Sequence, residues 1–186
     1  MIFGMKNDNF SSGMVKYVGH EIRAVIMNKL EMDVRDTVLL ANAESIAVEA
    51  SMVAYEGVVI AAERDAGSLR TMEENASKFG THNIEIIPEI TVEALEKLPT
   101  PRLAFIVAQK STIENDIVTL LKVNPKIKFI IYTLELDILA DIKYLMKKHG
   151  VDVTEVMQIA VSKVDKNGVF VAQPAPWMIT GEVKEK

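Results

Sequence analysis

The chain has 186 residues, of which 49% are hydrophobic and 25% are charged, and its formal net charge is −5. These values are typical of one globular domain, and the negative balance argues against a nucleic-acid-binding surface. There is no cysteine, which excludes disulfides, thiolate metal ligands and a cysteine nucleophile. No apolar run has the length of a membrane span, and residues 1–10 lack a signal-peptide pattern, so we expect a cytoplasmic protein that does not bind membranes.

Short β-branched stretches alternate along the chain with longer amphipathic ones, which predicts βαβ units around a mostly parallel sheet. The expected elements of the first half are a helix over 20–30, a strand over 37–41, a helix over 45–54, a strand over 58–62 and a helix ending near 79. Asp65 is expected to cap the last of these helices and Gly80 to end it.

The alternation continues to residue 149. We expect a strand over 83–87, a short helix over 92–98, a strand over 103–107, a helix ending near 123, a strand over 128–132 and a helix over 135–149. The pattern Ser-Thr-Ile-Glu at 111–114 is that of a capping box, so the helix that ends near 123 should begin there.

The last third is different, because two long strand-like runs, 153–164 and 169–179, are joined by a turn that contains Asn167-Gly168. Asn-Gly is a strong hairpin signal, whereas Pro174 and Pro176 cannot donate to a ladder and should bend the second strand. A hairpin after five strands that alternate with helices is the order of a class I methyltransferase. The predicted fold is therefore α/β and Rossmann-like, with a seven-stranded, mostly parallel sheet and a C-terminal antiparallel hairpin. Residues 1–186 would form a single domain, with an N-terminal arm over 1–18 and a closing hairpin over 151–181.

Several stretches in this order also resemble one family. They include GHEIRA at 19–24, ENASKFG at 74–80, NIEI at 83–86 and PWMI at 176–179. In these stretches the chain is similar to the decarboxylating precorrin methyltransferases of cobalamin biosynthesis, which act at carbon-15 of the corrin precursor. The resemblance implies S-adenosylmethionine as methyl donor, a polycarboxylate tetrapyrrole as small-molecule substrate, and a homo-oligomer, either a tetramer or a dimer.

The cofactor loop after the first strand departs from that family. The family pattern is acidic-x-Gly-x-Gly-x-Gly, whereas residues 40–45 read LANAES and the stretch is shorter. Glycines allow positive φ and a close approach of the backbone to the cofactor. Asn42 tolerates the left-handed region, but Ala43 and Glu44 do so poorly. Glu44 would also place a carboxylate at the helix N-terminus that, in the family, receives the carboxylate of the methionyl group.

Other positions that the resemblance assigns to the cofactor are also changed. Glu63 stands where the family has an acidic residue for the ribose hydroxyls; the alternative is a strand-end charge that pairs with Arg64 or faces solvent. Ile90 replaces an Asp near the adenine amine and cannot accept a hydrogen bond. Gln109 lies in a segment that replaces a glycine-rich one, so side chains should project into the cleft. The predicted cofactor positions are Asn42, Ala43, Glu44, Ser45, Glu63 and Gln109.

Together, these replacements predict a filled or rebuilt cleft with lost or weakened binding of S-adenosylmethionine. The alternative is a variant loop that binds the same ligand through Asn42 and Ser45. Carboxylates of the substrate would need cations, for which Arg23, Arg64, Lys110 and Lys163 are candidates by location; each could equally be a surface ion pair. The three histidines have no metal-site spacing, and no residue is singled out as catalytic.

Two functions therefore remain open from the sequence. One is a corrin-precursor methyltransferase and decarboxylase with an unusual loop. The other is a non-catalytic relative that keeps the fold as a binding or assembly subunit. An RNA methyltransferase is disfavoured by the net charge and by the lack of an aromatic-proline motif after the fourth strand.

Overall fold

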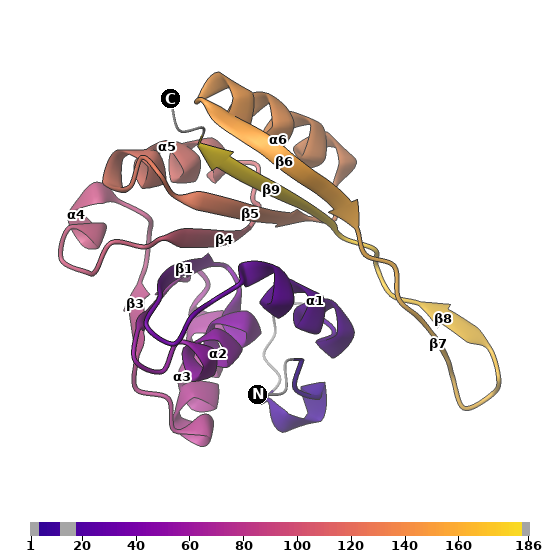
Figure 1. Cartoon of the computed structure of the whole chain (residues 1–186). Helices are drawn as coiled ribbons and strands as arrows, with labels where there is room; N and C mark the ends of the chain where they lie inside the picture. The colour runs from indigo at the N-terminus through magenta and orange to yellow at the C-terminus, as the bar shows by residue number, and fades with distance from the viewer. Residues whose placement is uncertain (1–3, 12–17, 184–186) are drawn as a thin grey trace.

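The computed structural model describes residues 4–11 and 18–183. Seven strands form one sheet in the order β3, β2, β1, β4, β5, β9, β6 (Figure 1). Neighbouring strands from β3 to β5 run parallel, and β9 is antiparallel to both β5 and β6. This confirms the predicted class I methyltransferase sheet. The strands are β1 (Thr37–Ala41), β2 (Val58–Ala62), β3 (Ile84–Ile87), β4 (Leu103–Val107), β5 (Lys128–Thr133), β6 (Val151–Gln158) and β9 (Trp177–Val183).

Helices cover both faces of the sheet (Figure 1). One layer consists of α1 (His20–Leu30), α2 (Glu44–Val53) and α3 (Ala66–Phe79), and the other of α4 (Val92–Leu95), α5 (Ile113–Val123) and α6 (Leu136–Lys148). A short 3-10 helix, η1 (Asn7–Asn9), precedes them. Among the described residues, none of the helices has both the length and the apolar character that crossing a bilayer would require.

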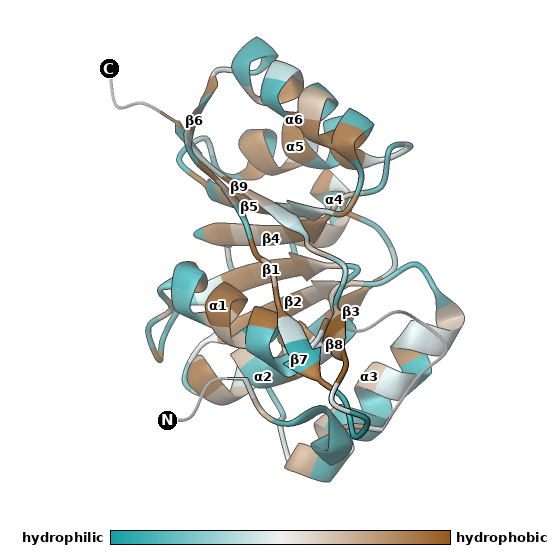
Figure 2. Cartoon of the chain, turned by 90° about the vertical axis from the view of Figure 1, so that its right-hand side faces the viewer, coloured by the Kyte–Doolittle hydropathy of each residue, from teal (hydrophilic) through white to brown (hydrophobic). Residues whose placement is uncertain are grey.

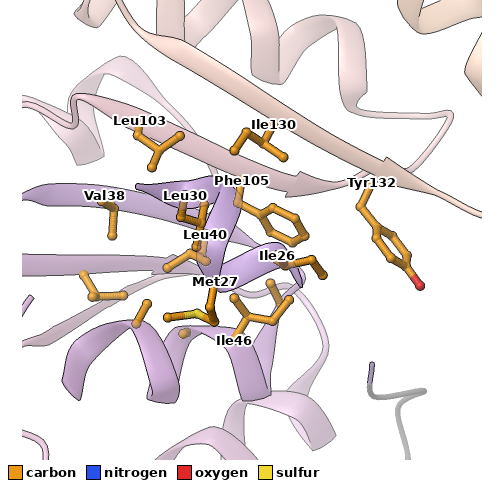
Figure 3. Close-up of a cluster of buried hydrophobic side chains, with 14 of the residues drawn as sticks. Ile26, Met27, Leu30, Val38, Leu40, Ile46, Leu103, Phe105, Ile130 and Tyr132 are labelled. Atoms are coloured by element: carbon orange, nitrogen blue, oxygen red, sulfur yellow. The ribbon is translucent and has the colours of Figure 1, made fainter. Parts of the chain in front are cut away.

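Alternate residues of the central strands face the two helix layers, as the pleat of a strand requires. In β1, Val38 and Leu40 pack toward α1 and α2, whereas Leu39 and Ala41 pack toward α5. The apolar strands thus lie between amphipathic helices (Figure 2). Figure 3 shows the buried cluster between the sheet and the layer of α1 and α2, in which Phe105 lies among side chains from α1 and β1. Burial on both faces explains why the strands are near-continuous apolar runs.

Local signals in the sequence determine both ends of α3. The Oδ1 atom of Asp65 accepts from the backbone N–H of Ser68 at 2.8 Å, and Gly80 ends α3 with a φ of 66°. The capping box predicted at 111–114 is wrong, because α5 begins at Ile113 after Thr112 and has no side-chain cap. The Glu114 carboxylate binds Lys148 and His149 of the neighbouring α6 end instead.

The predicted closing hairpin is divided into two parts. β6 and β9 complete the main sheet, whereas β7 (Ser162–Val164) and β8 (Phe170–Ala172) form a separate two-stranded sheet that projects from the body (Figure 1). We call this projecting part, residues 162–172, the arm. Residues 159–161 and the facing residues 173–176 belong to no strand, and Pro174 and Pro176, which lack an N–H group, lie in the second of these stretches. Gly168 makes the turn of the arm with a φ of 79°.

The N-terminal arm predicted over 1–18, which is distinct from the arm defined above, lies outside the described residues except at 4–11 and 18. Its described part packs against an ion pair between Arg23 of α1 and Glu49 of α2, which are 0% and 3% exposed. Glu49 accepts from the backbone N–H of Gly4, and the Arg23 guanidinium lies 4.6 Å from the centre of the Phe10 ring. Arg23 is therefore a buried structural cation, and its prediction as a substrate-binding residue is wrong.

Candidate functional site

The chain passes from β1 outward to β2 and β3 and then returns to place β4 on the other side of β1. In open α/β sheets such a reversal leaves a crevice at the carboxyl ends of the strands, which is the usual ligand site. Here it holds a cavity of about 640 Å³. Its walls come from the segments that follow β1, β2, β4 and β5, from the start of α1, and from residues 173–174.

All six residues predicted for the cofactor line this cavity: Asn42, Ala43, Glu44, Ser45, Glu63 and Gln109. Of the two predicted outcomes, a filled or a rebuilt cleft, the first does not hold, because a cavity remains between these side chains. α2 begins directly at Glu44, so the loop closes within two residues and the cavity in front of it stays open. Ile90, by contrast, is buried in the opposite core, with 1% of its surface exposed.

Asn42 adopts the left-handed conformation, with a φ of 54°. Its backbone N–H donates to Ala62 O at 2.9 Å, and its side-chain amide donates to Val107 O at 3.1 Å. The loop is thereby tied to both neighbouring strands without any glycine. Ala43 has a φ of −134° and Glu44 is helical, so the left-handed strain expected at these two positions does not arise.

Glu44 places a carboxyl group at the first turn of α2. Only 9% of the residue is exposed, and its Oε2 atom has no hydrogen-bond partner among the described residues. Burial, followed by the charges of Glu63 and Asp65, raises the pKa of Glu44 to about 7. A substantial fraction of this carboxyl is therefore protonated at neutral pH.

Glu63 directly follows the last residue of β2 and is 8% exposed. Burial raises the pKa of Glu63 and the nearby Asp65 carboxylate adds to this, whereas the hydrogen bond that Glu63 accepts from the backbone N–H of Asp65, at 3.0 Å, lowers it. The alternative of an ion pair with Arg64 is wrong. The Arg64 guanidinium instead donates to the buried carboxylate of Asp116 at 3.0 Å.

Arg64 lines a separate cavity of about 480 Å³, beside Glu89 and Thr91. The remaining candidate cations are also ion-paired, Lys110 with Asp137 and Lys163 with Glu21. None of the four predicted cations lines the larger cavity.

The larger cavity is also lined by Tyr132 and Gln173, which no motif of the sequence singles out. Tyr132 lies near the carboxyl end of β5, and its hydroxyl points away from the core cluster (Figure 3). Burial raises the pKa of this phenol, which therefore stays protonated at neutral pH. Its position beside the β4 end could have identified it. Gln173 lies so close to Gly19 that a Cβ atom on Gly19 would be 2.5 Å from the Gln173 Oε1 atom.

Within residues 4–11 and 18–183, no group of three or more His, Asp or Glu side chains is placed to hold a metal ion. What the cavity offers is two buried carboxyls, amides and a phenol. The sequence profile of the precorrin methyltransferase domain matches residues 13–181. The chain belongs to the precorrin methyltransferase family.

Solved structures agree with this membership. The chain is 25% identical to a precorrin-6y C5,15-methyltransferase from Geobacter metallireducens, with a TM-score of 0.86 over 98% of each chain. It is 19% identical to the precorrin 8w decarboxylase of Methanobacterium thermoautotrophicum, with a TM-score of 0.80 over 98% of this chain and 100% of that one. A SAM-dependent O-methyltransferase from Thermotoga maritima, 13% identical, shares the fold with a TM-score of 0.70, over 92% of this chain and 68% of that one. No curated protein matches the chain.

In this member of the precorrin methyltransferase family, the six positions that the resemblance assigns to the cofactor line one cavity. Its loop holds the required left-handed turn with Asn42 in place of a glycine. Because α2 begins at Glu44, the cavity has a carboxyl group at the start of this helix.

Proposed function

We propose that this chain is a methyltransferase that binds S-adenosylmethionine in the cavity between β1 and β4 and acts on a tetrapyrrole precursor, with loss of a carboxyl group. The observation that carries the proposal is the open cavity of about 640 Å³ at the point where the strand order reverses. A volume of this size is typical of a site for a nucleoside-sized ligand.

Residues of the cavity fit the nucleoside part of the ligand. The Glu63 carboxyl could accept hydrogen bonds from two ribose hydroxyls, because it lies at the end of a buried strand and keeps acceptor capacity beyond its bond to Asp65. The Asn42 Oδ1 atom is buried and lacks a partner among the described residues, so it offers a further acceptor. S-adenosylmethionine, when bound, supplies an electrophilic methyl group, and this chain would contribute chiefly by positioning.

Calorimetric titration with S-adenosylmethionine tests the proposal, using wild type and Glu63→Ala. We expect wild type to bind and Glu63→Ala to lose about ten-fold or more in affinity, the value of one or two lost charged hydrogen bonds. Glu56→Ala, at an exposed carboxylate beyond the far end of α2, is the matched control and should bind like wild type. Absence of heat and of a thermal shift at millimolar ligand would refute the proposal.

A second candidate function is a binding or assembly subunit without catalysis. The exposed arm would give such a subunit a binding surface, because Phe170 is 75% exposed and Val169 and Val171 are more than half exposed. We propose that the arm contacts a second copy of the chain in a homo-oligomer, since an isolated two-stranded hairpin with such a surface is marginal in water. Methyl transfer to a corrin precursor by the isolated chain would rule out the non-catalytic reading.

A further inference from the structure

The larger cavity has no cationic side chain among the described residues that line it. Its charged side chains are Glu44 and Glu63. Both ligands of the proposed function carry carboxylates, S-adenosylmethionine at its amino-acid end and the tetrapyrrole around its ring. A carboxylate that meets no arginine or lysine in the cavity has to be held by neutral N–H and O–H donors.

Neutral side chains with such donors come from several segments of the lining. They are Asn7, Asn42, Ser45, Gln109, Tyr132 and Gln173. The amide of Asn42 already donates to the carbonyl of Val107. Asn7 is distinguished by a contact with a buried cation, because the Nη1 atom of Arg23 donates to its Oδ1 atom at 3.3 Å.

This contact determines which way the Asn7 amide faces. An arginine side chain has donors and no acceptor, so the amide oxygen faces Arg23 and the amide nitrogen faces away from it. Among the described residues, no acceptor is bonded to the Asn7 nitrogen, which is also not one of the buried polar atoms without a partner. Because Asn7 lines the cavity, its N–H groups are available to a ligand there.

The Arg23 side chain is itself held firmly. It is 0% exposed, its Nε atom donates to the Glu49 carboxylate at 2.6 Å, and its other nitrogens donate to the carbonyls of Met5 and Val18. These two carbonyls lie on either side of Asn7 in the sequence. A guanidinium bonded to an amide oxygen also polarises the amide, which strengthens its N–H groups as donors. The Asn7 amide is thus a preorganised donor at the cavity wall.

We propose that the Asn7 amide donates a hydrogen bond to a carboxylate of the ligand in the larger cavity, and that Arg23 is the positioning residue that fixes this amide. The inference rests on the proposed function, which supplies the ligand. The carboxylate is either that of S-adenosylmethionine or one of the tetrapyrrole, and the experiment distinguishes the two.

Asn7→Asp separates the two ends of the amide. The oxygen that faces Arg23 is kept, so thermal melting should show no loss of stability. The donor becomes an anionic oxygen that repels a carboxylate. In calorimetric titrations at about pH 7.5, the affinity for S-adenosylmethionine should fall at least about ten-fold, whereas the affinity for its decarboxylated form should not fall. Asn7→Ala removes the donor without adding charge and should lose less affinity than Asn7→Asp.

The matched control is Asn9→Asp. Asn9 is an exposed residue of the same short 3-10 helix and does not line the cavity, so this variant should bind like wild type. It has the same net charge as Asn7→Asp, and it therefore isolates the effect of position.

A second titration uses uroporphyrin III, an octacarboxylic tetrapyrrole, and follows the quenching of its fluorescence. If Asn7→Asp weakens uroporphyrin III by about ten-fold or more and keeps the wild-type affinity for S-adenosylmethionine, the carboxylate bound by Asn7 is that of the tetrapyrrole. A loss for S-adenosylmethionine that spares its decarboxylated form assigns the carboxylate to the cofactor.

The remaining outcomes separate this inference from the proposed function. If Asn7→Asp loses affinity for neither ligand, weakens S-adenosylmethionine and its decarboxylated form equally, or behaves like Asn9→Asp, the role of Asn7 is overturned while the adenosyl site stands. If wild type does not bind S-adenosylmethionine, the proposed function is refuted and the inference falls with it.

Discussion

The side-chain amide of Asn42 donates to the carbonyl of Val107 at 3.1 Å, across the two strands between which the chain reverses its order. One residue thus joins the end of β1 to the end of β4 while its backbone makes the left-handed turn into α2. In a loop without glycine, Asn is well suited to the task, because it tolerates the turn and its amide can bridge to the neighbouring strand.

Two substitutions at Asn42 separate these contributions. Asn42→Gly keeps the conformational freedom but loses the amide bond to Val107, so we expect a loss of about 1 kcal/mol in the free energy of unfolding. Asn42→Val loses the bond and also forces a β-branched residue into the left-handed region, which costs a further 1–2 kcal/mol or so. Urea denaturation measures both values. Equal stability of the two variants would contradict a conformational role for Asn42.

Glu44 makes the stability of the chain depend on pH. Its pKa is about 7 in the folded state and near its ordinary value, 4.5, in the unfolded state. Between these values the folded state binds more protons, so its contribution is most favourable below about pH 4.5 and is lost as the pH rises through 7. We therefore expect Glu44→Gln to be more stable than wild type by about 1–3 kcal/mol at pH 8 and equally stable near pH 4.5.

Urea denaturation of wild type and Glu44→Gln at a series of pH values measures this difference. Other carboxyls titrate as well, so the quantity to follow is the difference between the two proteins at each pH. A difference that does not grow between about pH 5 and pH 8 would contradict the raised pKa.

The ion pair between Arg23 and Glu49 should be essential for stability. Arg23→Met leaves the Glu49 carboxylate buried without its cation and weakens the contact with residues 4–10, so we expect a loss of about 3–5 kcal/mol. Arg35→Met breaks an exposed pair with Glu56 and should change the free energy of unfolding by less than about 1 kcal/mol. The two variants are compared by urea denaturation, and similar losses would contradict the distinction.

The arm should affect association more than folding. Phe170→Ser removes the most exposed large apolar side chain of the arm, so we expect weaker self-association and an unchanged melting temperature at low protein concentration. Size-exclusion chromatography with light scattering measures the mass. Tyr144→Ser, at a residue of α6 that is 68% exposed, is the control and should leave the mass unchanged. A monomeric wild type would refute the proposed homo-oligomer.

Most of the sheet could be predicted from the sequence because its strands are buried on both faces. The runs at 37–41, 58–62 and 103–107 are bounded by polar or turn residues, and the observed strands begin and end at the predicted positions. The six residues predicted for the cavity do meet there, since the carboxyl ends of parallel strands share one edge of the sheet.

What the sequence did not reveal depends on partners far along the chain. Arg23 can be buried because its charge is paired with Glu49, which is 26 residues away in the sequence. Glu114 does not cap its own helix but accepts a hydrogen bond from Lys148, 34 residues further along the chain. The open cavity could not be predicted either. The sequence shows that larger residues replace the glycines of the loop. Whether their side chains obstruct the cavity depends on the path of the backbone from β1 into α2, which the sequence does not give.

Residues 173–174 wall the cavity and also form the root of the arm, where Gln173 lies against Gly19. A ligand in the cavity and a second copy of the chain bound to the arm would thus both contact this short segment or the residues next to it. By thermodynamic reciprocity, if occupancy of one tightens the other, the reverse holds to the same degree. In that case the affinity for the ligand and the affinity of self-association would change together, through residues 173–174.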